Sequence, residues 1–117
     1  MKLRKIALYM AMLITSASAQ ASTQDPGYIT GFITLPNNAG TGSRFLVYIN
    51  SARSARPSCD CCNRWEIDAT TPLGQSYASL LLTAYSMHRL VKIVGSGACV
   101  SGSNDTEGVS LIATDNL

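Results

Sequence analysis

Four cysteines restrict this chain more than any other feature, because three of them fall within four positions. Cys59, Cys61 and Cys62 form the sequence CDCC, and Cys99 is the fourth. Four cysteines allow three pairings. A bond from the cluster to Cys99 would close a loop of about 40 residues and stabilise the fold by about 3–4 kcal/mol. We favour Cys59–Cys99, which leaves Cys61 and Cys62 as an adjacent pair or as free or intermolecular thiols; Cys62–Cys99 with Cys59–Cys61 is the alternative.

The cysteine cluster does not have the spacing of a structural metal site or the context of a redox centre. A structural zinc site uses two pairs of ligands at spacings such as C-x2-C, and CDCC plus one distant cysteine does not supply them. Cys59 and Cys62 have the C-x-x-C spacing, but they lack the strand-to-helix context that lowers the pKa of a thiol. We therefore expect structural cysteines, no metal and no cofactor.

The N-terminus has the pattern of a secretory leader. Basic residues in MKLRK precede an apolar run at 6–15, and Ala17 and Ala19 form an A-x-A cleavage site. Ten apolar residues are too few to cross a bilayer, which needs about 20. We expect residues 1–19 to be a signal peptide removed after Ala19, with Ala21 as the less favoured alternative. The product would be periplasmic or secreted and would have no membrane span.

Removing the leader changes the charge of the chain. Three of the nine Lys and Arg residues leave with it, so six remain against seven Asp and Glu, and the net charge falls from +2 to −1. A domain that binds nucleic acid is normally basic, so nucleic acid is not expected as a partner. The remainder is long enough for one small domain. We assign 20–27 to a flexible lead-in and 28–117 to that domain.

The domain has the pattern of a mainly β protein with one helix. Thr71 is a candidate N-cap and Pro72 suits the first helical turn. Apolar residues then recur on one helical face, and Gly74 would let the helix approach a neighbour closely. The expected helix covers 71–88, and the expected strands cover 28–35, 44–50, 64–68, 90–94 and 109–115, with a Gly/Ser loop at 95–108.

The order of these elements is β-β-β-α-β-β, which is the succession of an OB-fold, a five-stranded Greek-key barrel. An α+β open sheet with the helix packed on one face is the alternative. Closing a barrel would remove the edge strands that an exported domain must otherwise protect.

Two stretches resemble a group of short, exported and largely uncharacterised bacterial proteins. They are RWEIDATTPLGQSYASLLLTAY and KIVGSGACVSGSNDTEGVSLI, and the resemblance covers residues 28–115. The shared pattern is a cysteine before an R-[WF]-x-[IV]-[DN] strand, a helix ending near LTAY, a V-x-G-x-G-x-C turn and a D-T-E segment. The resemblance implies export and an OB-like plan. Two extra cysteines and VSGSN, in place of an aromatic after the turn, depart from the pattern.

The same plan is similar to that of the B subunits of bacterial toxins. Those subunits are OB-folds that assemble as rings and bind cell-surface glycans. This similarity of architecture implies a homo-oligomer and a glycan partner, although a shared fold does not by itself establish a shared function.

The sequence does not contain a recognisable combination of catalytic residues. The only histidine, His88, ends the apolar helix face, and no serine lies in a nucleophile elbow, so a Ser-His-Asp triad is not expected. A small carboxylate-dependent hydrolase could use Glu66, Asp68 or Asp105. Such an enzyme needs two carboxyl groups that face each other across a cleft, and the sequence does not indicate such a pair. We expect no catalytic residues and no enzyme activity.

A binding module for a glycan or a protein is the function that we predict. Arginines gather around the second and third strands, close to aromatic residues. An envelope structural protein or an enzyme inhibitor acting through protein contacts is the alternative. The candidate ligand contacts are Arg53, Arg56, Arg64 and Tyr48.

Overall fold

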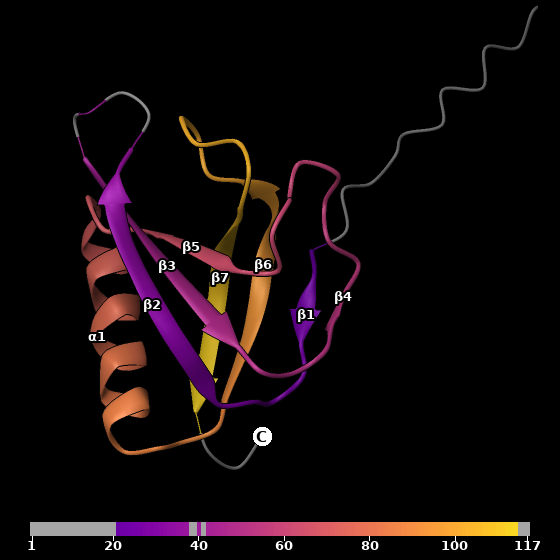
Figure 1. Ribbon diagram of the computed structural model, residues 1–117, viewed down its shortest axis with the longest axis vertical. Coiled ribbons are helices and arrows are strands. Elements are labelled where there is room, and N and C mark those ends of the chain that lie inside the picture. The colour runs from indigo at the N-terminus through magenta and orange to yellow at the C-terminus, as the bar shows by residue number, and fades with distance from the viewer. Residues whose placement is uncertain (1–20, 38–39, 41, 115–117) are drawn as a thin grey trace, which may run out of the picture.

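The computed structural model describes residues 21–37, 40 and 42–114, and the candidate leader at 1–19 lies outside these residues. The described chain is mainly β with one helix, as the sequence predicts (Figure 1). Its elements in chain order are β1 (Thr23–Gln24), β2 (Ile29–Pro36), β3 (Ser43–Ile49), β4 (Arg53–Ser54), β5 (Trp65–Asp68), α1 (Pro72–Ser86), β6 (Val91–Cys99) and β7 (Glu107–Thr114).

All seven of these strands join one mixed sheet in the order β2-β3-β5-β7-β6-β1-β4. Neighbours are antiparallel except for β5 and β7, which run parallel and are paired through Glu66 and Gly108. The helix lies in the connection from β5 to β6. Because β7 returns between β5 and β6, strands far apart in the sequence become neighbours at the centre of the sheet.

The sheet is open, so the expected five-stranded barrel is not confirmed, and the alternative of an open sheet with a packed helix describes the pairing better. The strands at its two ends, β2 and β4, are not neighbours. The N-terminal stretch nevertheless contacts both halves of the sheet. Thr23 pairs with Val94 and Gly27 bridges to Val91, whereas residues 29–36 pair with β3.

The expected flexible lead-in at 20–27 is a structured part of the sheet from Ser22 onward. Ser22 and Gln24 are buried, and Gly95 donates its backbone N–H to the Ser22 carbonyl at 2.8 Å. The side chain of Gln24 accepts a hydrogen bond from Trp65 Nε1 at 2.6 Å. A polar composition suggested a loop here, but a buried indole N–H needs a partner, and this segment supplies it.

The fourth strand is longer than predicted, because β6 continues through GSGAC to Cys99. The register of the β6–β7 pair shifts on either side of Gly95, and Gly97 has a positive φ of 81°. Glycines tolerate such irregular backbone inside a strand, so a sequence that reads as a loop still pairs. The loop between β6 and β7 therefore covers only residues 100–106.

The core lies between α1 and the sheet (Figure 1). Leu81 and Ala84 from the helix pack in one cluster with Trp65 and Ile67 of β5. Thr71 caps the helix, as predicted, by accepting a hydrogen bond from Gly74 N at 3.0 Å. A Cβ atom on Gly74 would overlap the Asp68 carbonyl, so the glycine allows the close helix–sheet approach that the sequence suggests.

Candidate binding site

Arg53 was expected to contact ligand, but its side chain is buried and only 1% exposed. Its guanidinium lies 3.7 Å from the centroid of the Trp65 ring and donates to the Arg64 carbonyl at 2.8 Å. Nη2 forms ion pairs with Asp60 at 2.7 Å and with Glu107 at 2.5 Å. Arg53 therefore stabilises the interior and is not available at the surface.

Arg44 is the centre of a second buried ion-pair network. Its guanidinium donates to both carboxylate oxygens of Glu66 at 3.0 Å, the bidentate geometry that makes such pairs strong. It also pairs with Asp105, whose other oxygen accepts from Arg64 Nη2 at 3.3 Å. Ser103 Oγ donates to Glu66 at 2.8 Å, so the network holds the 100–106 loop over β3 and β5.

Two pKa values in this network are shifted. The hydrogen bond to Glu66 raises the pKa of Arg44 above its ordinary value, against the opposing effect of burial. Burial acts to raise the pKa of Asp105, but hydrogen bonds from Thr106 and Arg44 together with the charges of Arg44 and Arg64 lower it overall. A general acid in glycoside hydrolysis needs a raised pKa, so Asp105 has the wrong direction of shift for that role.

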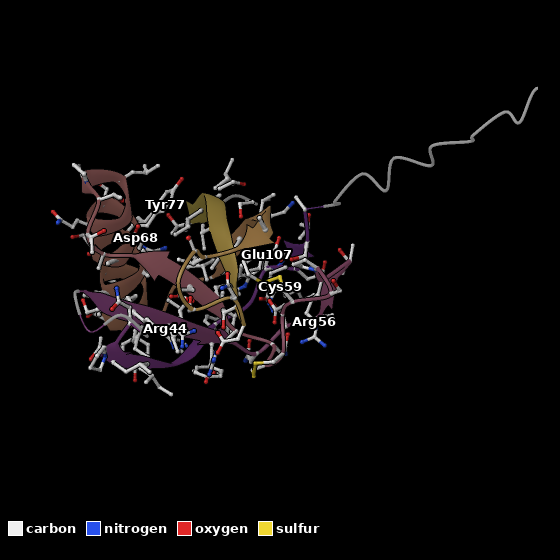
Figure 2. The ribbon with its side chains drawn as sticks, turned by 90° about the horizontal axis from the view of Figure 1, so that it is seen from above. Arg44, Arg56, Cys59, Asp68, Tyr77 and Glu107 are labelled. Atoms are coloured by element: carbon white, nitrogen blue, oxygen red, sulfur yellow. A yellow bond between two sulfur atoms is a disulfide. The ribbon has the colours of Figure 1, made fainter. Side chains whose placement is uncertain are left out.

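The remaining predicted contacts do not converge on one place. Arg56 is 40% exposed, lies 3.9 Å from Asp60, and is on the opposite side of the domain from Asp68 (Figure 2). Tyr48 is half-buried on β3, and Arg64 is engaged by Asp105 and by Thr106 Oγ1 at 3.0 Å. The arginines near these strands are thus neighbours of acids rather than an open cationic surface.

A polar cavity of about 90 Å³ opens instead at the end of β5. It lies between the β2–β3 connection, the start of β3 and the 100–106 loop, and Arg44 and Glu66 are its buried members. Asp68 carries an exposed carboxylate that accepts hydrogen bonds from Thr70 N and Thr70 Oγ1. The described residues lining it are Asn37, Ser43, Arg44, Glu66, Asp68, Thr70, Val100 and Ser101.

A second cavity of about 120 Å³ adjoins the first and is mainly apolar. Glu66, Asp68 and Val100 line both, so the two cavities are adjacent around the end of β5, and we refer to them together as the cleft. Leu73 and Tyr77 of α1 contribute to the apolar part, and Figure 2 shows Asp68 between Tyr77 and Arg44. Tyr77 is oriented by its hydroxyl, which donates to the Ser110 carbonyl at 2.8 Å.

A disulfide bond fixes the start of the loop that lines this cleft. Cys59 and Cys99 are bonded with an S–S distance of 1.99 Å and a Cα–Cα distance of 6.3 Å, and Cys61 is bonded to Cys62. The pairing is the one that we favoured, and no cysteine is free. Cys59 sits in the segment before β5 and Cys99 at the end of β6, so their bond fixes where the 100–106 loop begins.

Sequence reasoning missed the cleft because its residues come from separate loops. Glu66 and Asp68 were recognised as acids on one strand face, but Asn37, Thr70 and Ser101 carry no motif. The i, i+2 spacing of the two acids was the only available signal, because it places both side chains on one side of β5.

Neither family models nor comparisons with curated proteins and solved structures yielded a match to this chain. Across the described residues, no group of three or more His, Cys, Asp and Glu side chains could hold a metal ion. No helix in that part of the chain is long and apolar enough to cross a membrane.

Proposed function

We propose that this protein is an exported, non-enzymatic binding module of the OB-like plan, and that it binds an uncharged glycan in the cleft at the end of β5. The observation that carries the proposal is the position of the cleft. OB-folds bind oligosaccharides and oligonucleotides on the face of their second and third strands, between the loops that follow the first and fourth. In this chain the corresponding elements are β3 and β5, with the β2–β3 connection and the 100–106 loop, and they line the polar cavity.

The proposed plan is a barrel left open at one seam. Residues 23–36 support it, because this one stretch pairs with β6 at its beginning and with β3 over the rest of its length. The OB-fold is itself a partly open barrel, so an incomplete seam is compatible with it.

The lining of the cleft favours a sugar over a purely polar or purely apolar ligand. A pyranose ring has hydroxyl groups around its edge and C–H groups on its faces. The polar cavity offers the Asp68 carboxylate and the hydroxyls of Thr70 and Ser101 to the edge. The adjoining apolar cavity offers Leu73 and Tyr77 to a face.

The charge balance favours a neutral ligand. Four arginines near these strands form ion pairs with four acids, and some residues take part in two pairs. The pairs are Arg44–Glu66, Arg44–Asp105, Arg64–Asp105, Arg53–Glu107, Arg53–Asp60 and Arg56–Asp60. No arginine in these pairs is left as a spare cation for an acidic sugar or a phosphate. Within the cleft, the exposed Asp68 would repel an anion.

Glycan binding is tested with the disulfide-bonded protein on a glycan array, followed by titration calorimetry of any glycan retained. We expect Asp68→Asn and Ser101→Phe to weaken binding by at least about tenfold, because one removes a charged acceptor and the other fills the cavity. Arg56→Ala, on the opposite side of the domain, is the matched control and should bind as the unmodified chain does. Retention of no glycan, or an equal loss in Arg56→Ala, would contradict the proposal.

A protein contact is the second candidate, and the exposed apolar surface of α1 favours it. Leu73, Leu80 and Met87 are 61%, 37% and 58% exposed. The described helix carries no charged side chain. This face would serve a structural or inhibitory protein, and it would equally serve assembly of the binding module with its own copies.

A further inference from the structure

The carboxylate of Glu107 is buried in the interior and is bonded to the N-terminal segment. Glu107 and Ser22 are both fully buried. One carboxylate oxygen accepts hydrogen bonds from Ser22 N at 3.2 Å and from Gly97 N at 2.9 Å. The other accepts from Ser22 Oγ and from Arg53 Nη2 at 2.5 Å.

The buried ion pairs around Glu107 contain two carboxylates and one guanidinium. The same Nη2 atom of Arg53 lies 2.7 Å from Asp60, whose side chain is also fully buried. One buried guanidinium therefore serves two buried carboxylates. Arg56 approaches Asp60 only to 3.9 Å and is 40% exposed. Buried charges are costly unless each is paired, so a second cation beside Glu107 would offset the negative charge that Arg53 alone leaves unbalanced.

The chain can supply that cation at Ser22. Residues Ala19-Gln20-Ala21 form a second A-x-A sequence directly before it, and cleavage there turns the Ser22 amide nitrogen into the N-terminal ammonium group. We propose that the mature protein begins at Ser22 and that its α-ammonium forms a buried ion pair with Glu107. This inference rests on the export of the protein and is independent of the ligand.

The chemistry of this maturation is a peptide-bond hydrolysis by signal peptidase. Water adds its hydroxyl to the Ala21 carbonyl carbon and a proton to the Ser22 nitrogen as the C–N bond breaks, giving an Ala21 carboxylate and a Ser22 amine that is protonated at neutral pH. Because Ser22 is buried in the folded domain, a peptidase could not reach the Ala21–Ser22 bond after folding, and cleavage must therefore occur on the unfolded chain during export. Folding then places the new ammonium where the Ser22 N–H already meets Glu107.

Cleavage after Ala19 would give a different environment. Gln20 would then be the first residue, and the nitrogen of Ser22 would remain an amide with one proton and no charge. Glu107 would continue to share Arg53 with Asp60. The two processing products thus differ in whether Glu107 has a cation of its own.

The first test is the identity of the mature N-terminus. The full chain is expressed with its own leader in an exporting bacterium, and the product is examined by N-terminal sequencing and intact-mass measurement. We expect Ser22-Thr23-Gln24 as the first three residues. A product that begins at Gln20 would overturn this inference while leaving export intact, whereas an uncleaved chain would overturn export itself.

The second test is whether the ammonium stabilises the fold. Denaturation midpoints are compared at pH 7 for refolded, oxidised chains that begin at Ser22, at N-acetylated Ser22 and at Gln20. We expect the free Ser22 form to have the highest midpoint. Equal midpoints for the free and acetylated forms would overturn the proposal.

Glu107→Gln and alkaline pH provide the controls. In Glu107→Gln the advantage of the free ammonium should disappear, since the partner charge is gone. Glu107→Gln also removes a buried acceptor and is itself less stable. A second readout is therefore the pH dependence of stability in the free and N-acetylated Ser22 chains that keep Glu107. The advantage of the free form should decline as the pH rises past the usual α-amino range of about 7.7–8.0 and the ammonium loses its proton. If the free Ser22 form keeps its higher midpoint both in Glu107→Gln and at alkaline pH, the proposed ion pair is wrong.

Discussion

At the scale of single residues, Trp65 organises the interior of this domain. Its indole N–H donates to Gln24, and the Arg53 guanidinium lies over its ring. Gly95 lies against the ring as well, since a Cβ atom on this glycine would come within 2.8 Å of Trp65 Cζ3 and would overlap the Glu107 carboxylate. The glycine is therefore required by close packing and not only by the register shift in β6.

The first prediction concerns that glycine. Gly95→Ala should lower the free energy of unfolding by about 2–3 kcal/mol, because the methyl group overpacks the space between Trp65 and Glu107. Gly31→Ala is the matched control, since nothing lies within 4 Å of a Cβ atom there, and it should change stability by less than about 1 kcal/mol. Urea denaturation followed by Trp65 fluorescence measures both. Equal effects of the two substitutions would refute the packing role of Gly95.

Residue type predicted burial well for Trp65 and poorly for Arg53. A tryptophan that alternates with Ile67 on a strand indicates a core position, and both are buried. An arginine in a polar loop indicates exposure unless its partners are known. The carboxylates that bury Arg53 are 7 and 54 positions away, and nothing local in the sequence connects them.

At the scale of elements, a disulfide and two hydrogen bonds donated by backbone N–H groups join β6, the 100–106 loop and β7 to the segment before β5. The Cys59–Cys99 bond joins residues separated by 40 positions. Close to it, Cys61 N donates to the Asp105 carbonyl at 2.9 Å, and Glu107 N donates to Asp60 at 3.2 Å. These bonds hold the 100–106 loop at the edge of the proposed cleft.

The second prediction separates the two disulfides. Replacing Cys59 and Cys99 by alanine should cost about 3–4 kcal/mol of stability, because the denatured chain regains the freedom of a long loop. Replacing Cys61 and Cys62 should cost much less, because that bond joins adjacent residues and closes almost no loop. Thermal denaturation of the two double variants measures the difference. Similar losses in both would show that the long loop is not the source of stability.

The apolar periodicity of the sequence predicted the long elements. It did not predict short strands that form only by pairing with residues far away in the sequence. The helix was predicted to within two residues and β3 to within one, because their apolar spacing is regular. The short strands β1 and β4 were missed, since two residues carry no period. They exist because Thr23 and Gln24 pair with Ser54 and Arg53 across the sheet edge.

At the scale of the whole molecule, polar and apolar surfaces lie on different elements. Acids and arginines are paired with one another around β3, β5 and the loops near them, whereas the outward side of α1 is uncharged and exposes several large apolar side chains. Leu73, Leu80 and Met87 repeat every seven residues along α1 and its C-cap, so they lie on one side of the helix. Leu73 also lines the cleft, so we reserve the name α1 stripe for Leu80 and Met87. Contiguous exposed apolar side chains often mark an interaction surface.

The last prediction is that the α1 stripe joins copies of this chain. Residues repeated every seventh position remain on one side of a helix, which is the spacing that packs one helix against another. Because α1 has no charged residue, two identical helices can meet without burying an unpaired charge or opposing like charges. Leu80 and Met87 also line a cavity of about 100 Å³ together with Arg89 and Thr114, into which a partner side chain could insert.

Size-exclusion chromatography with light scattering across a range of concentrations measures this association. The double variant Leu80→Gln, Met87→Gln should weaken it by at least about tenfold, since burial of each large apolar side chain contributes about 1.5–3 kcal/mol. Leu82→Gln is the matched control, because Leu82 is 46% exposed but lies on another side of the helix. A monomer at every concentration, or an equal loss in Leu82→Gln, would exclude the α1 stripe as the interface. Self-association that depends on the stripe would place several glycan clefts in one particle, and binding to a multivalent surface would then be stronger than binding to a single glycan.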